Sequence, residues 1–78
     1  MDRESALSWI EEKVAKADLE MLLLGEDVVE VFKHKGKQVK LSLHRDYDKP
    51  GYVYVTFEMR GEETHHFSFT FAELGLKQ

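Results

Sequence analysis

One stretch decides the fold, and it reads Tyr52–Val53–Tyr54–Val55–Thr56–Phe57–Glu58–Met59. Successive side chains of a β-strand point to opposite faces, so this strict alternation predicts a strand with one buried and one outer face. The side chains expected on the buried face are Val53, Val55, Phe57 and Met59, and those expected on the outer face are Tyr52, Tyr54, Thr56 and Glu58. The same alternation in 65–71 places His65, Phe67, Phe69 and Phe71 on the buried face, with His66, Ser68 and Thr70 opposite.

Patterns of this kind and turn signals predict four strands, at about 28–33, 37–45, 52–60 and 64–71. The segment 46–51 contains Pro50–Gly51 and is the only long loop between them. Arg60–Gly61 marks the last hairpin, whose register the sequence leaves open.

The first hairpin is predicted to have a three-residue loop, His34–Lys35–Gly36, with Gly36 in the left-handed bulge position. This loop pairs Val31 with Val39 and Val29 with Leu41. It also places Glu30 opposite Lys40 on the outer face, where opposite charges on neighbouring strands attract.

The first third of the chain is predicted to be one amphipathic helix from about Arg3 to Leu24. Its apolar stripe recurs at spacings of three and four and consists of Leu7, Ile10, Val14, Ala17, Met21 and Leu24. Asp2 is a suitable N-cap, Ser8 with Glu11 offers a second start, and Gly25 suits the left-handed position after a helix. A break near Asp18 is left open.

These elements predict an α+β fold in which one N-terminal helix packs on a four-stranded antiparallel β-meander. A strongly curled sheet or small barrel is the alternative. The chain is expected to be one domain over 1–78, and its tail, 72–78, forms a short helical turn or frays.

The composition, 42% hydrophobic and 33% charged in 78 residues, is that of an ordinary soluble domain. Without cysteine it has no disulfide framework, thiolate nucleophile or cysteine zinc site. No apolar run resembles a signal peptide or a membrane span, so we expect a cytoplasmic protein. A core of this size supplies only about 3 to 5 kcal/mol, which favours self-association, for example as a homodimer.

The net charge of −4 is unevenly distributed along the chain. Residues 1–31 hold nine acidic and three basic side chains, whereas residues 32–60 hold three acidic and seven basic ones. The acidic start disfavours general nucleic-acid affinity, and the middle segment leaves room for a local basic patch.

The outer face of the predicted sheet carries the main functional signal. It is expected to present Val28, Phe32, Tyr52 and Tyr54 among Lys40, His44, Thr56, His66 and Thr70. Aromatic side chains combine large apolar area with little rotamer entropy and are enriched in protein contacts. Trp9 lies nearly opposite the helix stripe, where it either packs over the helix or anchors an interface. The predicted interaction residues are Trp9, Phe32, Tyr52, Tyr54 and His66.

Single-stranded nucleic acid is the alternative ligand, because sheet aromatics can stack on bases while lysines contact phosphates. The side chains expected to make these contacts are Lys35, Lys37, Lys40, His44 and Arg45. A solvated lysine-rich edge that resists aggregation explains the same charges.

Metal binding and catalysis have little support in the sequence. His65 and His66 point to opposite faces, and His44 lies two strands from His66, about 10 Å away, too far to share a zinc ion. Tyr54, His66 and Glu58 are the nearest acid/base groups, but no phosphate loop or histidine–carboxylate motif is present. We therefore expect no metal, no cofactor and no enzyme, but a small protein-interaction domain of the adaptor or inhibitor type.

Overall fold

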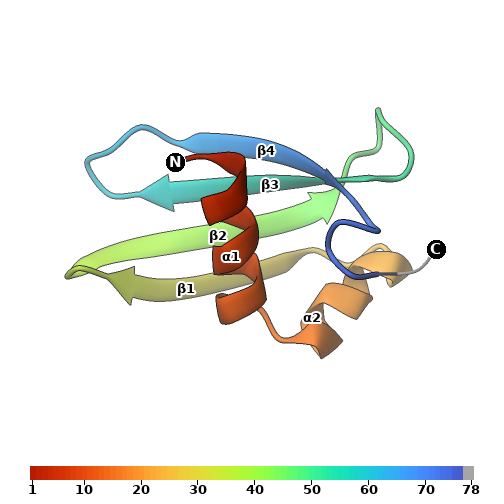
Figure 1. Cartoon of the computed structure of the whole chain (residues 1–78), viewed down its shortest axis with the longest axis horizontal. Coiled ribbons are helices and arrows are strands. Elements are labelled where there is room, and N and C mark those ends of the chain that lie inside the picture. Colours follow the sequence, from red (N-terminus) through yellow and green to blue (C-terminus); the bar gives the residue numbers. More distant parts are fainter. Residues whose placement is uncertain (77–78) are drawn as a thin grey trace.

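The computed structural model describes residues 1–76, which form an α+β fold (Figure 1). Its helices are α1 (Arg3–Lys13), α2 (Lys16–Met21) and the 3₁₀ helix η1 (Leu22–Leu24). Its strands are β1 (Val28–His34), β2 (Lys37–Arg45), β3 (Tyr52–Met59) and β4 (His65–Thr70). The strands pair antiparallel in the order β1-β2-β3-β4, which confirms the predicted meander, with strand bounds within one residue of expectation.

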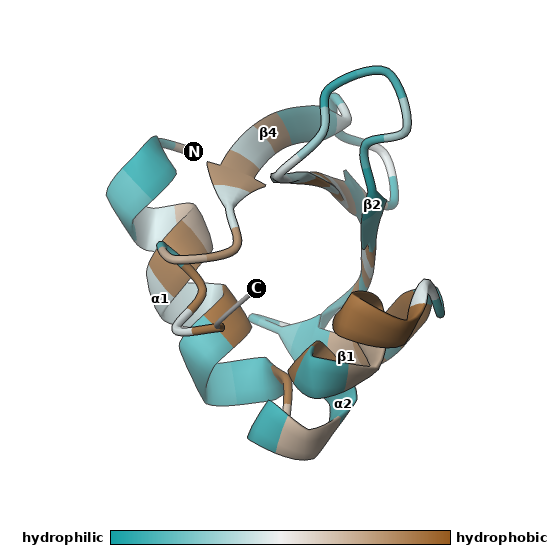
Figure 2. Cartoon of the chain, turned by 90° about the vertical axis from the view of Figure 1, so that its right-hand side faces the viewer, coloured by the Kyte–Doolittle hydropathy of each residue, from teal (hydrophilic) through white to brown (hydrophobic). Residues whose placement is uncertain are grey.

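The sheet curves around the core, and α1 closes the opposite side (Figure 2). It is an open sheet and not a barrel, because β1 and β4 do not pair within the described residues. Its inner face packs on the helices, and its outer face is convex.

The alternation predicted for β3 and β4 is confirmed. Val53, Val55, Phe57 and Phe69 are fully buried, and Tyr52, Tyr54 and His66 lie on the outer face. Phe57 pairs with His65 across β3 and β4, which settles the register of the last hairpin. These strands form the centre of the core.

The prediction of one continuous helix is wrong. Val14 and Ala15 have extended backbone with ψ of 121° and 145°, so the break precedes the position near Asp18 that the sequence left open. An 11-residue helix is about 16 Å long and matches the width of four strands spaced about 4.8 Å apart. A helix continued to Leu24 would be twice that length and would overrun the sheet.

The break also changes which apolar side chains face the core. Leu19 and Leu22 are buried after the turn, whereas Ala17, Met21 and Leu24, assigned to the predicted stripe, are exposed. The stripe prediction holds where its residues lie in α1 or at its end: Ile10 and Val14 are buried, and Leu7 is partly buried against the core. α1 and α2 do not share an axis, so the three- and four-residue spacing of the stripe in α1 does not continue into α2.

The helix ends follow their capping signals. The Asp2 carboxylate accepts a hydrogen bond from the Ser5 backbone N–H at 2.8 Å, which lowers the pKa of Asp2. Gly25 takes the left-handed conformation with φ of 84° and ends η1. Both features confirm the sequence prediction.

The C-terminal tail forms a hydrogen-bonded turn up to residue 76. The N–H of Leu76 donates to the Phe71 carbonyl at 2.9 Å, and Gly75 has φ of 75°, the arrangement of a Schellman motif. Leu74 and Leu76 are thereby buried against the core. Residues 77–78, which the sequence analysis included in this tail, lie outside the described residues.

The first hairpin differs from the prediction by one residue. Its loop has two residues, Lys35 (φ 52°) and Gly36 (φ 78°), which is the pattern of a type I′ turn. The predicted three-residue loop is therefore wrong. Val31 pairs with Lys40 and Phe32 pairs with Val39.

This shift turns every side chain of β1 to the other face. Val28 and Phe32, predicted outside, face the core, and Val29 and Val31, predicted inside, are 52% and 55% exposed. The larger Phe32 ring packs against the Trp9 ring at a centroid distance of 5.4 Å, an apolar contact that the opposite phase would remove.

Candidate protein-interaction surface

A cluster of rings lies on the outer face, and we call it the aromatic patch: His44 of β2, Tyr52 and Tyr54 of β3, and His66 of β4. Antiparallel pairing places His44 directly opposite Tyr54. The Tyr54 ring lies 5.4 Å from the His44 ring and 5.7 Å from the His66 ring, the latter stacked at 26°. The pairing therefore brings three of the sequence-predicted side chains into contact, His44, Tyr54 and His66, and Tyr52 lies on the same face two residues along β3.

Hydrogen bonds hold this patch in one arrangement. The Tyr54 hydroxyl lies 2.8 Å from His66 Nδ1, and His44 Nδ1 donates to the Arg45 carbonyl at 2.7 Å. The Lys49 ammonium lies 4.1 Å from the centre of the Tyr52 ring, within cation–π range. Rings held in this way lose little further entropy when a partner binds.

Trp9 and Phe32 do not belong to this surface, which corrects the predicted outer location of Phe32 and the predicted position of Trp9. The partly buried Trp9 ring packs on Phe32, on Phe57 at 5.8 Å and on His34 at 4.7 Å. α1 lies across the inner face of the sheet, so the side of the helix that seemed opposite to the apolar stripe still contacts β1. The Trp9 ring thus packs against the core, which agrees with the packing role, one of the two that the sequence left open for it.

The residues predicted to contact nucleic acid do not form one patch. Lys35 and Lys37 lie at the first hairpin, where Lys37 is 3.5 Å from the Glu62 carboxylate, and Lys40 lies 4.0 Å from Glu58 on the outer face. Lys37 and His44 are separated along β2 by about 23 Å, at 3.3 Å a residue. Lys35 and Lys37 therefore lie at the opposite end of the sheet from the aromatic patch, and Lys40 lies between them and the patch.

Arg45 is turned away from the outer face, contrary to its predicted place in a basic cluster. Its guanidinium donates to the carbonyl oxygens of Leu22 at 2.8 Å and Leu23 at 2.6 Å. Arg45 follows the outward-facing His44 in β2, so its side chain lies on the inner side of the sheet, beside the Phe71 ring. Arg45 therefore caps η1.

Sequence reasoning missed the exposure of Val29 and Val31. The segment Val28–Val29–Glu30–Val31–Phe32 carries apolar residues in both phases, so its pattern favours neither. The remaining signal was the turn, where Lys35–Gly36 forms a two-residue loop only if Lys35 accepts positive φ.

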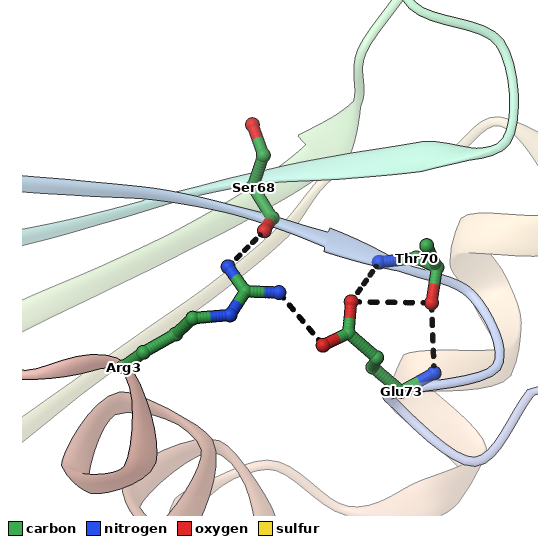
Figure 3. A network of polar contacts seen from close by, with 4 residues as sticks. All are labelled: Arg3, Ser68, Thr70 and Glu73. Carbon is green, nitrogen blue, oxygen red and sulfur yellow. Dashed lines mark hydrogen bonds and ion pairs between the residues drawn. The ribbon is translucent and has the colours of Figure 1, made fainter.

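Side chains of this chain bond to two backbone groups at the free edge of β4, those of Ser68 and Thr70 (Figure 3). Arg3 donates to the Ser68 carbonyl at 2.6 Å, and the Glu73 carboxylate accepts the Thr70 backbone N–H at 2.9 Å. Arg3 and Glu73 also form an ion pair at 2.7 Å. The Thr70 N–H, followed by Arg3, lowers the pKa of the Glu73 carboxyl.

The surface grooves are open and shallow. One of them, of about 390 Å³, is lined mainly by polar side chains, among them Gln38, Lys40 and Glu58. In residues 1–76, no three side chains of the metal-binding types gather at one point. The described helices include none that is long and apolar enough to cross a membrane.

Comparison of the chain with protein-family models, with curated proteins and with solved structures returned no match. The functional interpretation therefore rests on the geometry of the aromatic patch and of the sheet edges.

Proposed function

We propose that this chain is a small non-enzymatic interaction domain, of the adaptor or inhibitor type, that binds a protein through its aromatic patch. The observation that supports this is the arrangement of His44, Tyr54 and His66, whose rings are held together on a convex face. A convex surface with fixed rings suits a matching protein surface, because anchors that are already ordered bind with little entropy loss. We place the protein in the cytoplasm, since it has no cysteine for the disulfides of secreted small domains.

Photo-crosslinking tests this proposal directly. A photoreactive phenylalanine analogue replaces Tyr52 or Tyr54, and the matched control carries it at Glu11, an exposed position of α1. We expect the same discrete crosslinked protein from both tyrosine positions and none from Glu11. Equal products from all three positions, or no product from Tyr52 and Tyr54, would contradict the proposal.

A binding measurement with the purified partner then gives the magnitude. Substitution of both Tyr52 and Tyr54 by Ser removes two ring contacts, so we expect the affinity to fall by about 30-fold or more, as for hot-spot residues. Far-UV circular dichroism checks that the variant keeps its fold. Unchanged affinity in a folded variant would exclude the aromatic patch as the contact surface.

Single-stranded nucleic acid is the second candidate, supported by the Lys49 ammonium above the Tyr52 ring and by Lys35 and Lys37 at the hairpin tip. Fluorescence anisotropy with labelled oligonucleotides tests it. Binding that falls steeply with salt and is lost when Lys37 and Lys40 become Glu would favour nucleic acid over protein. We expect no such binding, because carboxylates pair with both lysines and the patch lies about 23 Å from Lys37.

A further inference from the structure

The two edges of the sheet differ in a way that points to a second binding surface. Arg3 and Glu73 occupy backbone groups of β4, whereas no loop, cap or side chain within residues 1–76 hydrogen-bonds to the outer edge of β1. In a two-residue hairpin the closing pair, here His34 and Lys37, exchanges both backbone hydrogen bonds. By alternation, the N–H and C=O groups of Val29, Val31 and Lys33 point away from β2.

The side chains at this edge are those of an association site. Val29 and Val31 are exposed by about half, and apolar side chains at a free edge strand favour pairing, although Lys33 at the same edge is charged. Val29 also lines a groove of about 250 Å³ beside the exposed Met21 of α2. A bare edge strand with exposed β-branched residues therefore continues into a groove that Met21, Val28 and Val29 line together with acidic side chains.

Charge identifies the occupant. The groove at the start of β1 is lined by the acidic side chains Asp18, Glu26, Asp27 and Glu30. The other end of the strand leads into Lys33, His34 and Lys35 at the hairpin tip. An antiparallel copy of β1 brings the basic tip of each chain to the acidic groove of the other, so the surface is complementary to itself.

We propose that two copies of this chain associate through antiparallel pairing of β1 with β1, with the hairpin tip of each copy seated in the acidic groove of the other. Outward backbone groups pair only with outward ones, so Val29, Val31 and Lys33 pair among themselves. The register with Val31 on the two-fold axis pairs the whole strand, so that Val28 lies opposite His34 of the second copy. This pairing forms about six backbone hydrogen bonds between the copies. It places Asp27 opposite Lys35.

This inference rests on the proposed function in one respect, that the domain acts through protein contacts, and it names a second copy as one partner. It uses the β1 edge, whereas the aromatic patch lies on β2, β3 and β4. The two-fold axis stands perpendicular to the sheet, so both aromatic patches stay on the same side of a continuous eight-stranded sheet. The dimer therefore leaves the patch available.

Sedimentation velocity over a range of protein concentrations tests the dimer. Val31→Glu introduces a carboxylate that faces Lys40 within its own chain but opposes its own copy across the two-fold axis. We expect the dimer dissociation constant to rise by about 30-fold or more in this variant and to change little in the matched control Val31→Thr. A wild-type protein that stays monomeric, or a dimer unaffected by Val31→Glu, would overturn the inference.

Charge reversal tests the orientation. Asp27→Lys and Lys35→Asp should each weaken the dimer by about tenfold, because each pair occurs twice, and the double variant should recover most of the affinity. Lys35→Asn controls for any effect of the turn, since Asn also tolerates positive φ. No recovery in the double variant would overturn the antiparallel pairing.

The aromatic patch gives the separating control. Tyr52→Ser with Tyr54→Ser should leave the dimer intact, because neither residue lies on β1. A dimer lost in that variant and kept in Val31→Glu would overturn the β1 inference while supporting contact through the patch.

Discussion

Arg45 is expected to be a large single contributor to stability, which is unusual for a charged residue on a sheet. Its Nε and Nη2 atoms donate to the Leu22 and Leu23 carbonyls at 2.8 and 2.6 Å. The Leu22 carbonyl also accepts the Gly25 backbone N–H at 3.1 Å, so Arg45 adds a second hydrogen bond to it. At Leu23 it bonds to one of the last carbonyls of the helix, which have no partner within the helix. The guanidinium carbon also lies 5.4 Å from the centre of the Phe71 ring, so Arg45 links η1, β2 and the C-terminal turn.

Substitution of Arg45 by Met keeps much of the apolar stem and removes the donors. Two hydrogen bonds from a charged donor contribute about 1.5 kcal/mol each at the lower end of their range, and the cation–π contact adds about 0.5 kcal/mol. The site is only partly buried, so water compensates some of this loss. We expect the free energy of unfolding to fall by about 2 to 3 kcal/mol, and Tm by roughly 8 to 24 °C for a domain of this size.

Urea unfolding followed by far-UV circular dichroism measures the change, at one protein concentration so that association does not alter the comparison. Lys40→Met is the matched control, because its 4.0 Å ion pair is exposed and should contribute less than about 0.5 kcal/mol. Arg45→Lys should fall between the two, since a single ammonium does not reproduce the guanidinium fork. A decrease of less than about 0.5 kcal/mol in the free energy of unfolding for Arg45→Met would refute the capping role, because Arg45 would then contribute no more than an exposed charged residue.

Three further predictions concern stability. Trp9→Ala should lower the free energy of unfolding, measured with urea, by about 3 kcal/mol, and the folded variant should bind the crosslinked partner as the wild type does. Weaker binding with little loss of stability would instead make Trp9 an interface anchor. Glu73→Gln should reduce stability above the ordinary carboxyl pKa of 4.5 and lose that effect as the pH falls through the lowered pKa of Glu73, because the Thr70 N–H and Arg3 favour the ionised carboxylate over the neutral acid. A constant difference from the wild type across a pH series of thermal unfolding would contradict this. Lys35→Asn should raise the free energy of unfolding by about 0.5 kcal/mol, because Asn–Gly is the favoured type I′ pair, and a decrease in the urea midpoint would argue against that turn.

β3 and β4 were predictable because their apolar and polar residues alternate in a single phase. In β3, exchanging the two faces would expose Val53, Val55 and Phe57 and bury Glu58, a difference of several kcal/mol in apolar burial alone. Pairing of these strands then brings Tyr54 beside His66. The aromatic patch was thus largely readable from the sequence, apart from Phe32.

β1 and the first third of the chain were less predictable, because their local signals are ambiguous. Val28 and Phe32 in one phase compete with Val29 and Val31 in the other, and the Phe32–Trp9 contact exists only after α1 has crossed the sheet. The helix break has no Pro or Gly to announce it. The break follows from the width of the sheet, and the local sequence of residues 3–24 holds no information about that width.

The amino-acid sequence by itself determined the order of the elements, the faces of β2, β3 and β4, and the caps at Asp2 and Gly25, because each depends on alternation or on a backbone preference within a few residues. Tertiary structure alone decided the break at Val14–Ala15, the register of β1, the burial of Trp9 and the difference between the two sheet edges. Each of these depends on contacts between segments far apart in the chain, such as Arg3 with Ser68 and Arg45 with Leu22. A local sequence pattern does not reveal the free energy of such contacts.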